Sequence, residues 1–162
     1  MNTNLLGKVA LFRGGDPISF LVKWQTRSTI SHAALLIPGT RRVIEAYPGS
    51  GVRTRELTDE DMKKVDLYDV KGMTPEMWQG AIDFAASQIG MPYDWWSVMR
   101  FVSKRAARDN KKWFCSELVH KAIAEQGIRL LERIPSAEVS PAMLGISPLL
   151  APVSGVEGNV IG

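Results

Sequence analysis

The segment KKWFCSELVHKA, residues 111–122, contains the only cysteine of the chain, Cys115, and one of its two histidines, His120. Polar residues follow the cysteine, apolar residues recur behind them, and Gly127 closes the pattern, which predicts a helix that begins at or next to Cys115. The positive end of the helix dipole and the two preceding lysines would favour a reactive thiolate there. The alternative is an inert thiol, because free cysteines are among the most buried residues.

Two histidines could serve this thiol as a base. His120 lies five residues further along the same predicted helix, about 140° around its axis, so its side chain would point away from Cys115. We therefore expect His120 at the surface or in an interface. His32 starts the apolar segment HAALLI at an expected strand end, where a hydrogen-bonded core histidine is the alternative to a base. Glu45, inside the apolar VIEA, either faces solvent by strand alternation or meets a partner such as His32.

The rest of the chain divides into a strand-rich first half and a helix-rich second half, which predicts an α+β fold in one domain over residues 1–162, with its core at about 7–147. The expected strands cover residues 7–12, 31–37, 41–47, 51–57 and 63–70. The expected helices cover residues 18–26, 74–90, 93–108 and 115–127, and Thr74 and Pro75 form the start of the second of these. The tail after residue 136 is expected to be rich in loops and to end loosely.

Composition limits the possible classes of protein. The chain has 162 residues, 45% hydrophobic and 23% charged, which is ordinary for a globular domain. No apolar run approaches the ~18 residues of a membrane span, and the N-terminus lacks a signal-peptide core. We therefore expect a cytoplasmic protein, or one that is virion-associated or exported without a cleaved signal. A single cysteine and two histidines argue against structural zinc, and the sequence points to no metal or cofactor.

The positive charge is concentrated in one stretch, residues 100–112, which holds six basic residues and one acidic residue. On a helix, Arg100, Lys104 and Arg108 would share one face, with Arg105 beside it. This face is either simply solvated or contacts an anionic surface such as lipid headgroups or cell-wall polymers. The stretch lacks the interleaved aromatic residues of a stacking platform, which argues against nucleic acid as the partner.

The motifs SHAALLI, VIEAY, IGMPYDWW, WFCSELVHKAI and SPAML, in this order, resemble the circularly permuted branch of the NlpC-like papain-fold peptidases. The histidine segment precedes the cysteine helix, as in YiiX-like proteins and the lecithin:retinol acyltransferase group. The resemblance extends from about residue 7 to residue 147. It implies an antiparallel β-sheet packed against helices, with the cysteine at a helix N-terminus.

The resemblance also implies roles for residues of this chain. Cys115 would be the nucleophile, His32 the general base and Glu45 the residue that orients the imidazole. Tyr93 would line the site and help to hold the oxyanion, together with the backbone N–H of Cys115. Trp95 and Trp113 are candidates for the walls of a substrate groove, although core packing is the usual role of tryptophan.

The activity implied is that of a bacterial or phage cysteine hydrolase that cleaves amide bonds through a thioester acyl-enzyme, for example in cell-wall peptides. Phe114 and the sequence Asp94-Trp95-Trp96 depart from the pattern of the wall-cutting branch, so two alternatives remain open. One is an acyltransferase or thioesterase-like hydrolase that acts on lipid or acyl-ester substrates. The other is a binding or virion module that keeps the fold without turnover.

Overall fold

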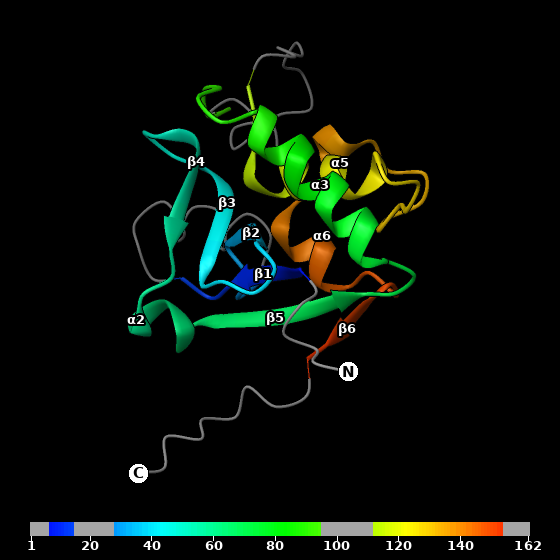
Figure 1. Ribbon diagram of the computed structural model, residues 1–162, viewed down its shortest axis with the longest axis horizontal. Helices are drawn as coiled ribbons and strands as arrows, with labels where there is room; N and C mark the ends of the chain where they lie inside the picture. The colour runs from blue at the N-terminus through cyan, green and yellow to red at the C-terminus, as the bar shows by residue number, and fades with distance from the viewer. Residues whose placement is uncertain (1–6, 15–27, 95–111, 154–162) are drawn as a thin grey trace.

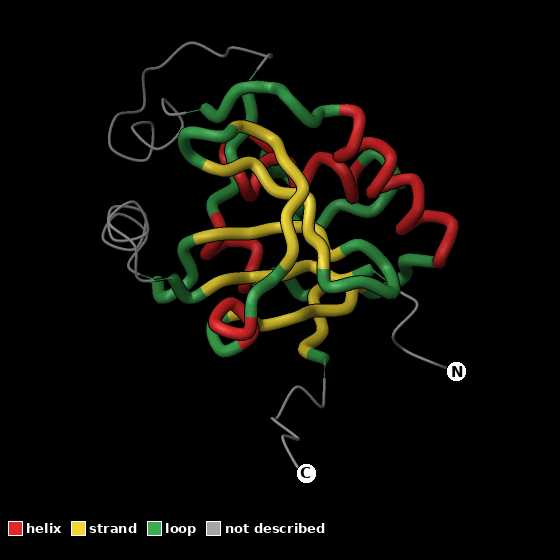
Figure 2. The backbone as a smooth tube through the Cα atoms, turned by 60° about the vertical axis from the view of Figure 1, so that its left-hand side comes forward, coloured by secondary structure: helices red, strands yellow, loops and turns green. Residues whose placement is uncertain are grey.

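The computed structural model describes residues 7–14, 28–94 and 112–153. Their central feature is an antiparallel sheet in the order β4-β3-β2-β1-β5-β6 (Figure 1). Its strands are β1 (Lys8–Phe12), β2 (His32–Leu36), β3 (Arg42–Tyr47), β4 (Gly51–Glu56), β5 (Val65–Val70) and β6 (Leu150–Pro152). The tube in Figure 2 shows that the sheet twists strongly, as sheets of L-amino acids do.

The helices in the described ranges are α2 (Asp59–Met62), α3 (Pro75–Ser87), α5 (Cys115–Ala124) and α6 (Pro141–Gly145), with a short 3₁₀ helix, η2 (Ser136–Glu138). Helix α5 packs against β2 and β3 on one side and against α3 and α6 on others (Figure 1). It is therefore the central helix of the helical layer, and its first residue, Cys115, lies near the strands that carry His32 and Glu45.

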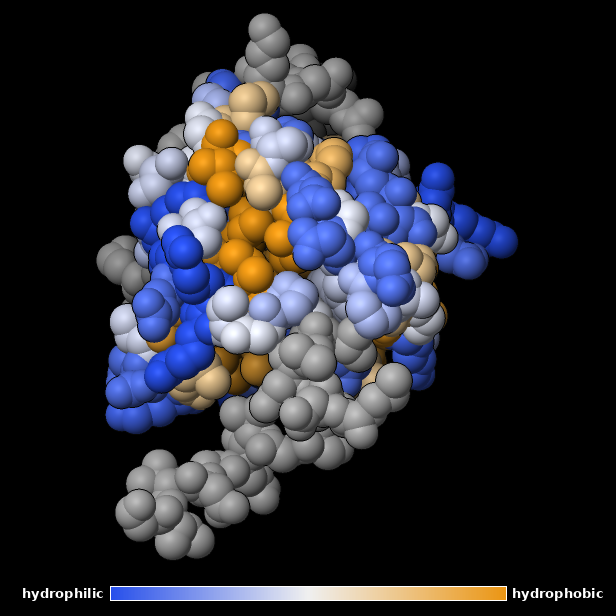
Figure 3. All heavy atoms as spheres, in the orientation of Figure 1, coloured by the Kyte–Doolittle hydropathy of each residue, from blue (hydrophilic) through white to orange (hydrophobic). Residues whose placement is uncertain are grey.

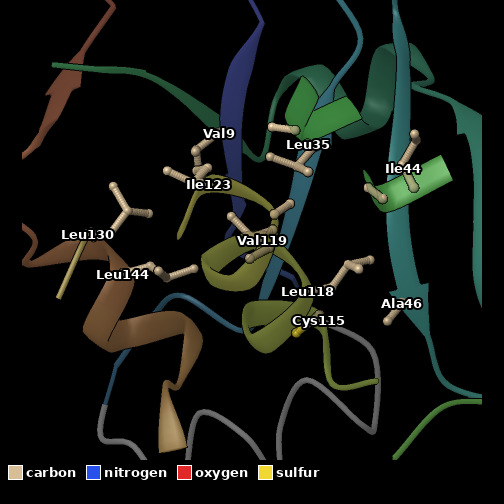
Figure 4. Close-up of a cluster of buried hydrophobic side chains, with 14 of the residues drawn as sticks. Val9, Leu35, Ile44, Ala46, Cys115, Leu118, Val119, Ile123, Leu130 and Leu144 are labelled. Atoms are coloured by element: carbon tan, nitrogen blue, oxygen red, sulfur yellow. The ribbon is translucent and has the colours of Figure 1, made fainter. Parts of the chain in front are cut away.

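Two apolar clusters form the core, one on each face of the sheet. Strand β1 alternates between them: Val9 and Leu11 belong to the larger cluster, which includes α3 and α5, and Ala10 and Phe12 belong to the smaller one. Figure 4 shows the larger cluster, with Cys115 at one end of α5. Because both faces of β1 are covered, its side chains are buried throughout.

The five expected strands are confirmed, and so are two expected helices, α3 and α5. The Thr74 hydroxyl accepts a hydrogen bond from the Met77 N–H at 3.2 Å, as expected of an N-cap. In the tail, where loops were expected, the structure has α6 and the short strand β6, which pairs with β5. Strand β6 has only three residues and ends in a proline, so its sequence shows too little alternation of apolar and polar residues to predict a strand.

Several expectations concern segments outside the described residues. These are the helix over residues 18–26, most of the helix over residues 93–108, and the loose end of the tail. The basic face of Arg100, Lys104, Arg105 and Arg108 belongs to the second of these segments, so its contact with an anionic surface stays a prediction.

The face seen in Figure 1 carries an apolar area bordered by hydrophilic residues (Figure 3). Among the described residues, Ile146 and Ile89 are the large hydrophobic side chains with substantial exposure. No helix in the described ranges is both long enough and apolar enough to cross a bilayer.

Gly51 fixes the segment that leads to Tyr93. Its φ is +71°, and a Cβ there would lie 2.3 Å from the carbonyl oxygen of Met91. The neighbouring Val52 N–H donates to that same oxygen at 2.9 Å, and Val52 O accepts from the Gly90 N–H at 2.9 Å. The edge of β4 therefore holds residues 90–91 in place, and it can do so only where residue 51 has no side chain.

We expect Gly51→Ala to lower the free energy of unfolding by more than Gly39→Ala. Both glycines have a positive φ, so each alanine costs roughly 1–2 kcal/mol of backbone strain. Gly39 has no neighbour within 4 Å of the added methyl group, whereas Gly51 meets a backbone oxygen. Urea denaturation of the two variants measures the difference, and equal losses would contradict the close approach as the cause.

Candidate active site

Cys115 is the first residue of α5 and exposes only 2% of its surface. The preceding residue, Phe114, has an extended backbone and caps the helix without a side-chain hydrogen bond, while its carbonyl accepts the Leu118 N–H at 3.0 Å. The Ser116 hydroxyl donates to the Val139 carbonyl and ties the first turn to the segment before α6. The thiol therefore lies at the positive end of a helix whose N-terminus carries no capping side chain.

The structure brings Cys115, His32 and Glu45 together from three different elements. His32 begins β2 and Glu45 lies within β3, and His32 Nε2 is 2.6 Å from Glu45 Oε2. The His32 side chain also interacts with Cys115, which is one of the causes that raise the pKa of His32. Thiol, imidazole and carboxylate are thus neighbours in the folded chain.

The charged forms of His32 and Glu45 stabilise each other. Burial alone would lower the pKa of His32, but its hydrogen bonds and charge interactions with Cys115 and Glu45 outweigh burial and raise the pKa to about 10. Burial alone would raise the pKa of Glu45, but the hydrogen bond and charge of His32, with the charge of Arg55, lower it to about 2. At neutral pH the arrangement therefore holds an imidazolium beside a carboxylate.

Two arginines that the sequence reasoning missed complete the surroundings of Glu45. The carboxylate is fully buried, and its Oε1 accepts from Arg55 Nε at 2.7 Å and from Arg53 Nε and Nη2 at 3.1 and 3.0 Å. Both arginines lie on β4, and Arg53 is directly opposite Glu45 in the strand register. The sequence held one signal for these arginines. Glu45 lies in an otherwise apolar strand, and a buried charge needs a partner. Arg53 and Arg55 are two residues apart, so they share one face of the next strand.

The other expected site residues, Tyr93, Trp95 and Trp113, all precede Cys115 in the sequence. Tyr93 is buried, forms an isolated parallel bridge with Trp113, and its ring centroid is 5.8 Å from that of Phe114. The indole N–H of Trp113 donates to Gln88 Oε1 at 3.0 Å, so this tryptophan packs against α3. Trp95 lies outside the described residues.

The expectation of a surface position for His120 is wrong. His120 is 2% exposed, and its Nδ1 is 2.7 Å from the Ser136 hydroxyl. Burial lowers its pKa, as do the charges of Arg129 and Lys121, against a raising hydrogen bond with the Leu131 backbone. The angle around the helix axis placed His120 away from Cys115 but could not predict its burial, because η2 covers this side of α5.

His120 also lines a cavity of about 390 Å³ together with Trp113, Lys121 and Arg129. Neither Cys115, His32 nor Glu45 lines this cavity. His120 is hydrogen-bonded to Ser136, whereas His32 interacts with Cys115. This agrees with the expectation that the side chain of His120 points away from the thiol.

The paired charges predict how stability depends on pH. The raised pKa of His32 stabilises the fold fully below its ordinary value of 6.5, and this contribution is lost as pH rises through about 10. The lowered pKa of Glu45 stabilises the fold above its ordinary value of 4.5, and this contribution is lost as pH falls through about 2. We therefore expect the highest free energy of unfolding between about pH 4.5 and 6.5.

Urea denaturation at pH 3, 5.5 and 9.5 tests this expectation. The wild-type free energy of unfolding should fall by a few kcal/mol on both sides of pH 5.5. In Glu45→Gln the alkaline loss should shrink, because His32 has lost its negative partner. An alkaline loss of equal size in wild type and variant would contradict the assignment to this pair.

A solved structure has a similar fold. The structure resembles the crystal structure of the metalloprotein YiiX from Escherichia coli O157:H7, with a TM-score of 0.71 and 20% identity over 92% of this chain and 96% of that one. In the described residues of this chain, no group of three or more His, Cys, Asp and Glu side chains could hold a metal ion. No curated protein shows significant similarity to the sequence.

A family model covers most of the chain. Residues 16–134 match the model of the permuted papain-like amidase enzymes, YaeF/YiiX, the C92 family of peptidases. The match includes the expected histidine strand, the glutamate strand and the start of the cysteine helix, in the permuted order. The chain therefore belongs to the permuted papain-like amidase family C92 and has its fold, that of a cysteine hydrolase of the peptidase or amidase type.

Proposed function

We propose that this protein cleaves amide bonds with Cys115 as nucleophile, His32 as general base and acid, and Glu45 as the residue that orients His32. The observation that carries the proposal is an imidazole, that of His32, that lies 2.6 Å from a fully buried carboxylate and interacts with the thiol of Cys115. A thiol, a base and a third group that fixes the base are the parts that nucleophilic catalysis requires.

The reaction would begin from the thiolate–imidazolium pair. The Cys115 sulfur attacks the amide carbonyl, and the oxyanion that forms is held by the Cys115 backbone N–H at the start of α5, with Tyr93 as the second donor. The His32 imidazolium then donates its proton to the departing amine, and a thioester remains on Cys115. A water molecule gives a proton to His32 and attacks the thioester, which releases the acid and restores the thiol proton to the pair.

Bacterial cell-wall peptides are the substrate class that we propose first. The resemblance to the NlpC-like peptidases implies cleavage of the amide bonds in such peptides. The second candidate is the transfer or hydrolysis of lipid or acyl-ester groups. It is favoured by the apolar surroundings of the thiol, since Cys115 belongs to the larger core cluster together with Phe114, Ala46 and Leu118 (Figure 4).

Trapping the acyl-enzyme distinguishes these candidates. The purified protein is incubated with one panel of muropeptides and another of phospholipids and p-nitrophenyl acyl esters, quenched in acid, and analysed by intact-mass spectrometry. Cys115→Ser serves as the matched control, because a hydroxyl replaces the thiol with little change in volume. We expect an adduct on Cys115 and a released amine with members of the muropeptide panel, and no thioester in the control.

Two other outcomes would change the proposed function. Adducts with the acyl esters or phospholipids alone would replace the amidase proposal with the second candidate. No adduct on either panel, together with no alkylation of Cys115 by iodoacetamide at pH 7, would reject both and favour a binding module without turnover.

A further inference from the structure

The imidazole of His32 contacts two aromatic rings, and an arginine that also binds Glu45 lies over each of these rings. The His32 ring centroid is 5.3 Å from that of Phe12 and 5.8 Å from that of Tyr47, the latter edge-on. The guanidinium carbon of Arg53 lies 4.1 Å from the Tyr47 ring centroid, and that of Arg55 lies 5.7 Å from the Phe12 ring centroid. Each arginine therefore contacts two neighbours of His32, the Glu45 carboxylate and one aromatic ring.

The two arginines are themselves held in place. Arg55 Nη1 donates to Asp61 Oδ2 at 2.7 Å, and the Thr58 N–H and hydroxyl donate to the same oxygen at 2.8 Å each. Arg53 Nη1 donates to the Ser50 hydroxyl at 3.2 Å. Arg55 therefore connects the capping box of α2 to Glu45, whereas Arg53 is anchored in the turn before β4.

The cluster around Glu45 holds more positive than negative charge. The cations are Arg53, Arg55 and the His32 imidazolium, and the anions are Glu45 and Asp61. The thiolate that the proposed reaction places on Cys115 would balance these charges. If the arginines were absent, Glu45 would be a fully buried carboxylate with a single partner, and such a group tends to take up a proton. A neutral carboxylic acid at that position could not stabilise the imidazolium.

We propose that Arg53 and Arg55 are positioning residues of the reaction: they keep the Glu45 carboxylate ionised and aimed at His32, and they fix the rings that orient the imidazole. This proposal rests on the proposed function, since it assumes that His32 and Glu45 serve Cys115. Arg55 carries the larger share, because it is the less exposed of the two and is tied to a second carboxylate.

The pH dependence of kcat/KM for p-nitrophenyl butyrate tests the proposal in wild type, Arg55→Met and Arg53→Met. For Arg55→Met we expect a loss of roughly 10²-fold near pH 6 and an acid limb that moves up by roughly 1–3 pH units, because Glu45 now takes up a proton more readily. Arg53→Met should show the same changes at smaller size. Arg55→Lys should recover part of the loss, since it restores the charge but not the stacked, forked geometry.

Two controls separate positioning from a general structural effect. Arg41→Met removes an arginine that pairs with Asp59 on the exposed side of α2, and we expect it to leave the pH profile unchanged. In a Glu45→Gln background, Arg55→Met should cause no further movement of the acid limb, because no carboxylate is left to titrate there. A loss that is independent of pH, or equally large in both backgrounds, would overturn the proposal.

A measurement without substrate keeps this proposal separate from the proposed function. In Cys115→Ala protein, the His32 ring ¹³Cε1 signal is followed by NMR from pH 3 to 7, and His120→Gln assigns the two histidines. We expect an inflection between about pH 3 and 5 in the Arg55→Met variant that is absent from its parent, which reports the protonation of Glu45. Identical titrations would overturn the role of Arg55, even if wild-type protein turns over none of the substrates.

Discussion

Replacing Cys115 with alanine is expected to lower kcat/KM by roughly 10⁴-fold or more on any substrate that the wild type cleaves. The thiol supplies the bond-forming atom, and no other cysteine in the chain can replace it. The residual rate would come from binding and from oxyanion stabilisation at the start of α5. Initial rates with the best muropeptide or ester of the panels measure the loss.

The change should leave the fold intact. Alanine at position 115 removes one buried sulfur at the first position of α5. We therefore expect cooperative urea unfolding, as in the wild type, with a free energy of unfolding lower by about 1 kcal/mol. Activity of Cys115→Ala within tenfold of the wild type would rule out covalent catalysis by this residue.

Replacing His32 with alanine is expected to lower kcat/KM by roughly 10³-fold or more, because the imidazolium both stabilises the thiolate and protonates the leaving group. It also leaves Glu45 buried without its partner on Oε2, although Arg53 and Arg55 still bind Oε1. We expect the remaining activity to rise with pH as the thiol ionises without an imidazolium beside it. Rates between pH 5 and 10 measure both effects.

His120→Gln is the matched control, because glutamine can still hydrogen-bond to the Ser136 hydroxyl. We expect its kcat/KM to stay within a few-fold of the wild type at all pH values, since His120 binds Ser136 rather than the thiol. If His120→Gln removed activity while His32→Ala preserved it, the assignment of the base would be wrong.

The sequence determined strands β1 to β5, helices α3 and α5, and the order of the candidate site residues along the chain. The apolar runs at 7–12 and 31–37 and the start signals at Thr74 and Cys115 are local patterns, and local patterns predict local structure. The motifs around His32, Glu45, Tyr93 and Cys115, in this order along the chain, were sufficient to indicate the permuted family. Helix geometry alone directed the side chain of His120 away from that of Cys115.

The environment of each charged group could be decided only by the tertiary structure. Alternation left open whether Glu45 faces solvent, because the answer depends on the side chains of β4. Arg53 lies opposite Glu45, and Arg53 and Arg55 both donate to its carboxylate, which can therefore be buried as an ion. The exposure of His120 depended on η2, which is more than ten residues away in sequence. Burial and pairing are properties of neighbours that meet only after folding, so the pKa values of His32 and Glu45 could not be obtained from the sequence.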